Sequence, residues 1–236
     1  MAAGPAGVTP VSARAHVFVT DIGRPVLDAS DHHHLTRVLR LVAGSEVTAG
    51  DGAGGWRPCR LTGGAALAVD GPEVVDARPD PPLTVAFALV KGDRPELVVQ
   101  KLTELGIDRI VPFVAARSVV RWDASKAARQ ADRLNEIARQ AAMQCRRTWL
   151  PDVAPLATFD EVAALDGAAL ADADGEIATL AHPVVLVGPE GGWTSEERSS
   201  QLRIVRLGSH VLRAETAAIT AGAVMAALRD GIVSLG

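Results

Sequence analysis

From about residue 83 onward, continuous apolar runs alternate with amphipathic stretches. The apolar runs are typical of strands buried on both faces of a sheet, and the amphipathic stretches have helical spacing. The predicted strands are 83–90, 107–114, 184–188 and 203–208. The predicted helices are 92–106, 125–146, 158–167, 194–202 and 215–231. Because strands and helices alternate, this part is expected to be α/β with a parallel sheet.

Two of these helices carry signals at their ends. Asp93 with Glu96, and Thr194 with Glu197, have the spacing of a capping box. Gly106 is expected to end the first predicted helix. Its inward side chains are predicted to be Leu97, Val98, Leu102 and Leu105.

Residues 14–75 have a different pattern, with short β-like segments around one helix. Ser30 or Asp31 can cap that helix, and Gly44 is expected to end it. Its apolar face is predicted to hold Leu35, Val38, Leu39 and Val42. A small β-barrel with one helix fits this pattern.

A proline-rich stretch separates the two parts. Pro79, Pro81 and Pro82 interrupt regular structure, as expected at a domain boundary. We therefore divide the chain into a β-barrel domain (1–75), a linker (76–82) and an α/β domain (83–236).

The composition favours a soluble cytoplasmic protein. The 236 residues are 48% hydrophobic, which excludes a largely disordered chain. The sequence shows neither an apolar run long enough to span a bilayer nor the features of a signal peptide. Cys59 and Cys145 are too few for a disulfide framework or a metal site. We expect no metal and no membrane partner.

The charge is distributed unevenly although the net charge is only −4. Residues 117–150 hold eight Arg and Lys against three acids, whereas residues 151–182 hold seven acids and no Arg or Lys. The first segment predicts a basic face that contacts phosphates. A solvated helix surface is the alternative.

Two predicted strands end in glycine-marked loops, "VVLVGPEGGW" and "VRLGSHVLRAETA". Ligands of open parallel sheets bind beyond this end of the strands, and glycine lets a backbone approach a ligand closely. Two tight turns are the alternative. Neither loop has the phosphate-binding pattern of a P-loop or of a dinucleotide fold.

The motifs "VLVGPEGGWTSEE" and "LGSHVLRAETAAITAG" resemble the paired C-terminal motifs of SPOUT-class methyltransferases. With "HHLTRVLRLVAGSEV" and "KGDRPELVVQKLTELGIDRIVPFVAARSVV", they are similar to the RsmE family of 16S ribosomal RNA uridine-N3 methyltransferases. The resemblance covers roughly residues 14–230. It implies a PUA-like RNA-binding barrel, a C-terminal trefoil knot and a homodimer. It also implies that the substrate is 16S rRNA, taken to be part of the assembled small subunit.

The implied cofactor is S-adenosylmethionine, held by the two glycine loops. Gly188, Gly191 and Gly192 are expected to leave room for it, and Leu207, Gly208, Val211 and Leu212 to surround the adenine and ribose. Leu186, Glu190 and Thr216 complete the predicted set. Glu190 either holds its loop through backbone N–H groups or faces the cofactor or a partner subunit.

Methylation of a uracil nitrogen requires alignment of the reactants and loss of a proton. Arg213 is expected to stabilise negative charge on a uracil oxygen. Glu215 is expected to accept the proton or orient the base. Alternatively, Glu215 only interacts with the dipole of the last helix.

The candidate RNA contacts are Arg14, Arg37, Arg40, Arg117, Arg121, Arg146 and Arg147. His32, His33 and His34 are consecutive on a helix and point in different directions, so they are not expected to share a metal. In "QCRRTW", Cys145 stands where the family pattern has a hydroxyl residue.

Two other functions remain open. One is a non-catalytic RNA-binding or ribosome-assembly factor with a PUA-like module. The other is a different SPOUT methyltransferase, which methylates a transfer RNA or a ribose 2′-hydroxyl.

Overall fold

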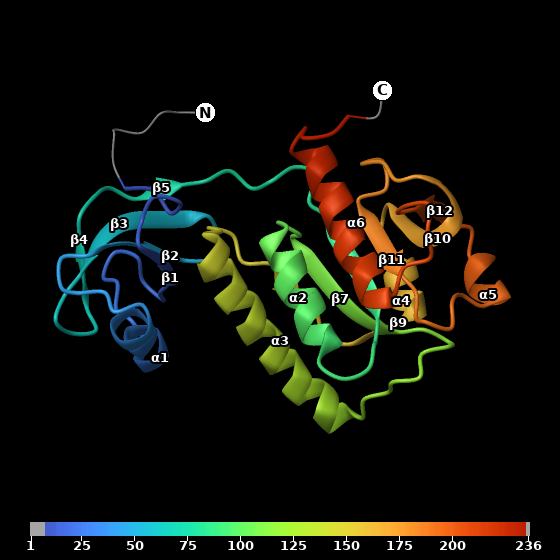
Figure 1. Ribbon diagram of the computed structural model, residues 1–236, viewed down its shortest axis with the longest axis horizontal. Coiled ribbons are helices and arrows are strands. Elements are labelled where there is room, and N and C mark those ends of the chain that lie inside the picture. Colours follow the sequence, from blue (N-terminus) through green and yellow to red (C-terminus); the bar gives the residue numbers. More distant parts are fainter. Residues whose placement is uncertain (1–7, 235–236) are drawn as a thin grey trace. The chain divides into compact units, whose positions relative to one another are not determined.

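The computed structural model describes residues 8–234, which form two compact units (Figure 1). The first unit holds residues 8–78 together with Ala142–Leu150, and the second holds Pro79–Ala141 and residues 151–234. The sequence pattern assigns 142–150 to the second domain, but this segment packs within the first unit. There the Thr148 hydroxyl donates to Asp76 Oδ2 at 2.8 Å.

The first unit is built on a five-stranded sheet in the order β1-β2-β3-β4, with β5 paired to β3. The strands are β1 (Ala15–Phe18), β2 (Glu46–Gly50), β3 (Gly55–Leu61), β4 (Leu67–Val69) and β5 (Val74–Val75). The β1–β2 pair is parallel and the other pairs are antiparallel. Its core packs Leu35 against buried residues of the strands such as Val17, Val47 and Leu61.

The predicted helix of this unit differs in its bounds and its buried face. It begins as α1 (Ala29–His33), capped by Asp28 rather than by Ser30 or Asp31, and continues with π-helical pitch as η1 (His34–Val38). The wider π turn changes the direction of successive side chains, and the helix ends before Val42. Of the four residues predicted to face inward, Leu35 is buried, whereas Val38, Leu39 and Val42 are exposed. Gly44 lies in a later turn before β2, so it does not end the helix.

The second unit contains the predicted parallel sheet, with seven strands. Six lie in the order β12-β10-β11-β6-β7-β8, β9 pairs with β7, and all pairs are parallel. The strands are β6 (Thr84–Ala88), β7 (Arg109–Val114), β8 (Asp152–Val153), β9 (Ala157–Thr158), β10 (Ala168–Ile177), β11 (Val184–Val187) and β12 (Arg203–Arg206). The helices are α2 (Arg94–Glu104), α3 (Ala124–Cys145), α4 (Phe159–Ala163), α5 (Ser195–Arg198) and α6 (Ala214–Arg229).

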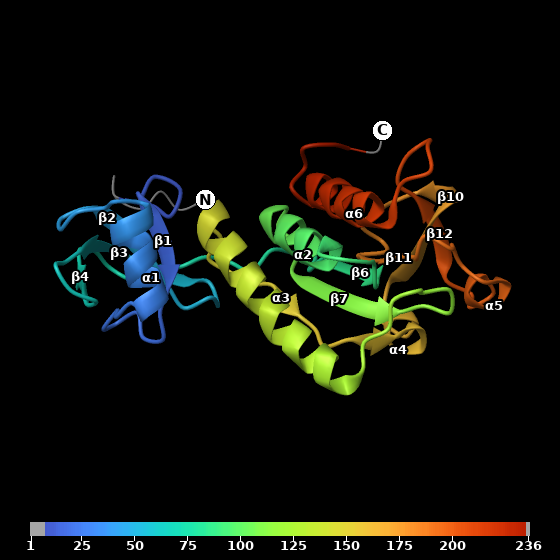
Figure 2. The ribbon, with the colours of Figure 1, turned by 60° about the horizontal axis from the view of Figure 1, so that its bottom comes forward.

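Side chains of both sheet faces are buried, as the continuous apolar runs predict. Along β6, Val85 and Phe87 belong to one core, with α2, α3 and α6, whereas Ala86 and Ala88 belong to the other. Figure 2 shows α2 and α4 on opposite sides of β7, and Val162 of α4 belongs to the second core. No helix within residues 8–234 is long and apolar enough to cross a bilayer.

The strand β10 was not predicted from the sequence. Its apolar part is only "AALA", and acidic residues with a glycine follow, a pattern more typical of a loop. In the structure its register against β12 shifts between Ala171 and Glu176. The residues between these positions therefore leave regular pairing and are available to form a site.

The capping predictions have different outcomes. Thr194 and Glu197 form the predicted capping box at α5. Asp93 makes no side-chain cap bond within the described residues, and Glu96 instead forms two hydrogen bonds with Arg133 of α3. Leu97 is 41% exposed, so its predicted inward position is wrong.

Helices α2 and α6 run parallel, side by side, over one face of the sheet. A Cβ added to Gly222 of α6 would lie 2.6 Å from Leu102 Cδ2 of α2, so any larger residue would force the Leu102 side chain to move. Ion pairs join the two helices at both ends. Arg94 meets Glu215 at the first turns, and Arg229 meets Asp108 just beyond the end of α2.

Candidate functional site

A cavity of about 420 Å³ lies at the carboxyl edge of the parallel sheet. Its walls come from β10 at its register shift, from the segments after β11 and β12, and from the first turn of α6. This is the edge at which open parallel sheets bind ligands. The cavity is therefore the candidate site.

Seven of the ten residues predicted to bind a cofactor line the cavity: Gly188, Glu190, Gly192, Leu207, Gly208, Val211 and Leu212. The other three lie elsewhere. Leu186 is fully buried in the sheet core, Gly191 packs against Arg117, and Thr216 is exposed on α6.

Sequence reasoning missed several lining residues, including Asp172, Trp193 and His210. Trp193 directly follows the GPEGG stretch, and His210 lies inside the second glycine-marked loop, so both could have been inferred from their position. Asp172 had no such signal because β10, on which it lies, was not predicted.

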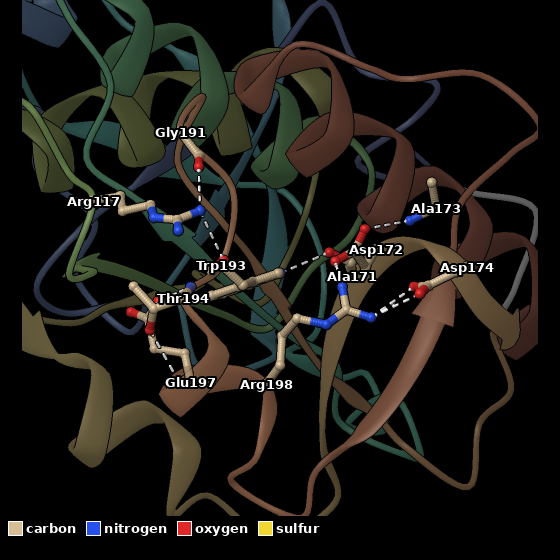
Figure 3. Close-up of polar contacts among 10 residues, drawn as sticks. All are labelled: Arg117, Ala171, Asp172, Ala173, Asp174, Gly191, Trp193, Thr194, Glu197 and Arg198. Carbon is tan, nitrogen blue, oxygen red and sulfur yellow. Dashed lines mark hydrogen bonds and ion pairs between the residues drawn. The ribbon is translucent and has the colours of Figure 1, made fainter.

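The loop after β11 is held from two sides (Figure 3). Arg117 Nη1 donates to the carbonyl oxygens of Gly191 and Trp193, each at 3.1 Å. The Trp193 indole donates to the carbonyl of Ala171 at 3.0 Å and stacks on Phe113. These contacts fix the loop between the segment after β7 and the wall formed by β10.

Helix α5 is bound both to the segment after β7 and to β10. Glu197 of its capping box also accepts from the backbone N–H of Ala116 at 2.9 Å. Arg198 donates to Asp172 and to both carboxylate oxygens of Asp174, the latter at 3.0 and 2.8 Å (Figure 3). The hydrogen bond from Arg198 lowers the pKa of Asp174. The irregular stretch of β10 beside the cavity is thereby tied to α5.

The two residues predicted to be catalytic occupy different surroundings. Arg213 is the N-cap residue of α6 and lines the cavity. Glu215 is not among the lining residues. Its side chain is 13% exposed, and its Oε1 lies 3.6 Å from Arg94 Nε. Its Oε2 is buried and has no hydrogen-bond partner among the described residues. Arg94 Nη1 lies 3.5 Å from Oε1 of Glu190, which does line the cavity.

The predicted RNA contacts are divided between the two units. Within the first unit, Arg14, Arg37 and Arg40 are exposed, and Arg146 donates to the backbone carbonyl of Arg14 at 2.9 Å. Burial lowers the pKa of Arg146. Arg147 Nε donates to the carbonyl of Trp149 at 3.1 Å.

In the second unit, Arg121 is exposed, while the guanidinium of Arg117 is bound to the loop after β11. His32 and His33 lie in α1, and His34 begins the π-helical turn. Across residues 8–234, no three His, Cys, Asp or Glu side chains are grouped as metal ligands would be.

Comparisons with known proteins agree on one family. A sequence profile of the RNA methyltransferase domain matches residues 78–226, and one of the RNA methyltransferase PUA domain matches residues 27–67. Ribosomal RNA small subunit methyltransferase E of Mycobacterium bovis is 33% identical over 222 residues, 83% of each chain. The enzyme of the same name from Bacillus subtilis is 32% identical over 218 residues, 80% of this chain and 84% of the relative.

A solved structure shows the same fold over nearly the whole chain. Ribosomal RNA small subunit methyltransferase E from Neisseria gonorrhoeae, bound to S-adenosyl methionine, superposes with a TM-score of 0.77 at 28% identity. The match covers 91% of this chain and 97% of that one.

Proposed function

This chain belongs to the family of ribosomal RNA small subunit methyltransferases E, and we propose that it transfers a methyl group from S-adenosylmethionine to N3 of a uridine in 16S ribosomal RNA. The observation that carries the proposal is the cavity at the carboxyl edge of the sheet, because it is formed by both glycine-marked loops of the family motif. The substrate is the assembled small subunit, in the cytoplasm.

The lining residues fit the cofactor. A cavity of about 420 Å³ is in the range of roughly 300–1,000 Å³ that is usual for small-ligand sites. Leu207, Val211 and Leu212 offer apolar surface for the adenine. Gly192 has a φ of +67°, and a Cβ added there would meet no described atom within 4 Å, so its backbone borders open space. When bound, S-adenosylmethionine supplies a methyl group made electrophilic by its sulfonium.

The residues of this chain then act on the uracil. With the cofactor bound, the uracil N3 would form a bond to the methyl carbon as the carbon–sulfur bond breaks, and the N3 proton would pass to solvent water. Negative charge develops on the uracil oxygens as that proton leaves. Arg213 lines the cavity and carries the positive charge that stabilises it. The uracil must be extruded from its RNA to reach this position.

RNA binding is assigned to exposed arginines of both units. The PUA match supports the first unit as an RNA-binding module, with Arg14, Arg37 and Arg40 as its phosphate contacts. Arg121 is the corresponding candidate in the second unit. Arg117 is better explained as a support for the Gly191–Trp193 backbone, since both of its bonds are intramolecular.

The proposal includes a homodimer and a C-terminal trefoil knot. A knot requires the chain to come back across the sheet after β12. After β12 at one edge of the sheet, α6 returns to pack on α2 and on the central strand β6. The homodimer is supported by the apolar character of α6, where Ile219 and Val224 are only partly buried within the chain.

The test is methylation of purified small subunits, of free 16S RNA and of transfer RNA, followed by mass spectrometry of the digested nucleosides. We expect one 3-methyluridine per subunit and much less product on free RNA. Methylation of a ribose 2′-hydroxyl or of a transfer RNA would assign the chain to a different RNA methyltransferase activity. Binding of RNA without any methyl transfer would support an assembly factor instead.

A further inference from the structure

Arg94 lies between two carboxylates that come from the two glycine-marked segments. Its guanidinium is 3.5 Å from Glu190 Oε1, in the loop after β11, and 3.6 Å from Glu215 Oε1, in the first turn of α6. Arg94 itself is the first residue of α2, on a third segment. One cation therefore connects three separate parts of the chain beside the cavity.

Each of the two carboxylates is close in the chain to a wall of the cavity. Glu190 is itself a lining residue, and Glu215 is two residues after Arg213 and one after Ala214, both of which line the cavity. Arg94 thus links the loop after β11 to the first turn of α6, which directly follows Arg213.

We propose that Arg94 is a positioning residue for the methyl transfer and that Glu215 acts through Arg94, rather than as the acceptor of the uracil proton. This inference rests on the proposed function. Glu215 is absent from the cavity lining, and its nearest cationic contact is Arg94. Through its ion pair with Arg94, Glu215 can hold the start of α6 against α2.

Loss of Arg94 should affect the rate of methyl transfer more than the stability of the fold. The Arg94 side chain is 38% exposed and both of its ion pairs are long, so solvent screens them and they add little to stability. The loop after β11 also has its own bonds to Arg117, which the removal of Arg94 should leave in place. However, a shift of about 1 Å in a reacting geometry can cost about 100-fold in rate.

The experiment compares wild type with Arg94→Met, Arg94→Lys, Glu215→Gln and the Arg94→Met/Glu215→Gln double variant. Arg109→Met is the matched control, because Arg109 also forms an exposed ion pair. Arg109 begins β7, so it lies at the amino ends of the strands, away from the cavity at their carboxyl ends. Single-turnover methylation of small subunits, calorimetric binding of S-adenosylmethionine and melting temperature are measured for each protein.

We expect Arg94→Met to slow methyl transfer by about 10- to 100-fold, with cofactor affinity within about threefold of wild type. Its melting temperature should match that of the control. Arg94→Lys should recover part of the rate, and the double variant should be no slower than Arg94→Met, because both changes remove one interaction.

Three results would overturn the inference: a wild-type rate in Arg94→Met, additive losses in the double variant, or a rate loss that follows a fall in melting temperature. Wild-type protein that methylates no RNA would refute the proposed function itself, and with it the positioning role. Active wild type with fully active Arg94→Met would refute the positioning role alone.

Discussion

Arg229 Nη1 lies 2.6 Å from Asp108 Oδ2, and both side chains are 6% exposed. The same carboxylate oxygen accepts from the backbone N–H of Leu83 at 2.9 Å, and Arg229 Nη2 donates to the carbonyl of Gly106 at 3.0 Å. This buried pair joins the last turn of α6 to the segments that lead into β6 and β7.

Removal of one partner from this pair should be costly. Arg229→Met leaves a buried carboxylate without its arginine, so we expect the free energy of unfolding to fall by about 3–5 kcal/mol in urea denaturation. The double variant Arg229→Met/Asp108→Asn should lose less than the single variant, because no isolated charge remains. Equal stability of Arg229→Met and wild type would show that the pair contributes nothing.

Gly192→Val should abolish binding of S-adenosylmethionine, measured by calorimetry. A valine side chain would project where a Cβ meets no described atom, beside the cavity, and the φ of +67° is strained for a branched residue. Gly192→Ala is the control, since it also places a side chain at this positive φ but adds only a single methyl group. Equal losses in both variants would indicate strain rather than obstruction, and unchanged affinity in Gly192→Val would remove the loop from the site.

Arg213→Ala should lower single-turnover methylation of small subunits by about 10²–10³-fold, the usual effect of losing a group that stabilises developing charge. Cofactor affinity should change little, because the apolar lining remains. If affinity falls by the same factor as the rate, Arg213 binds the cofactor rather than the transition state.

Glu215→Gln should slow methylation by a factor that is the same at every pH from neutral to alkaline. This follows from the positioning role, in which Glu215 transfers no proton. A proton acceptor would behave differently, since loss of rate would shrink as the uracil deprotonates without help at higher pH. A pH series of single-turnover rates on small subunits separates the two.

Arg37→Ala with Arg40→Ala should weaken binding to small-subunit RNA and flatten its dependence on salt. Both side chains are exposed in the first unit. Each lost phosphate contact is expected to reduce the salt slope by about 0.7–0.9. The measurement is filter binding across a salt series, with Arg24→Ala, another exposed arginine of this unit, as the control. An unaltered slope would assign these arginines to a solvated surface.

The sequence was most informative where the signal is local. The capping box of Thr194 and Glu197 needs only four residues of one segment, and the structure contains it. Asp93 and Glu96 have the same spacing, but a tertiary partner, Arg133, takes the glutamate. Local spacing alone cannot distinguish these two outcomes.

The parts of the site that depend on long-range contacts could not be predicted. Arg94 is 96 residues from Glu190 along the chain, and Arg117 reaches the carbonyl of a residue 74 positions away. Such pairs follow only from the order of the strands. Similarly, the basic run predicts Arg117 as an RNA contact, but charge counts do not reveal that its guanidinium also binds the loop after β11.

The ion pairs at both ends of α2 and α6 limit how the lengths of these two helices can change in this chain. A one-residue insertion within either helix would rotate the later residues by about 100° and shift them by about 1.5 Å. Arg94–Glu215, the Gly222–Leu102 contact and Arg229–Asp108 could not then all form together. Among descendants of this sequence, these two helices should therefore diverge by substitution, while insertions and deletions accumulate in segments outside them.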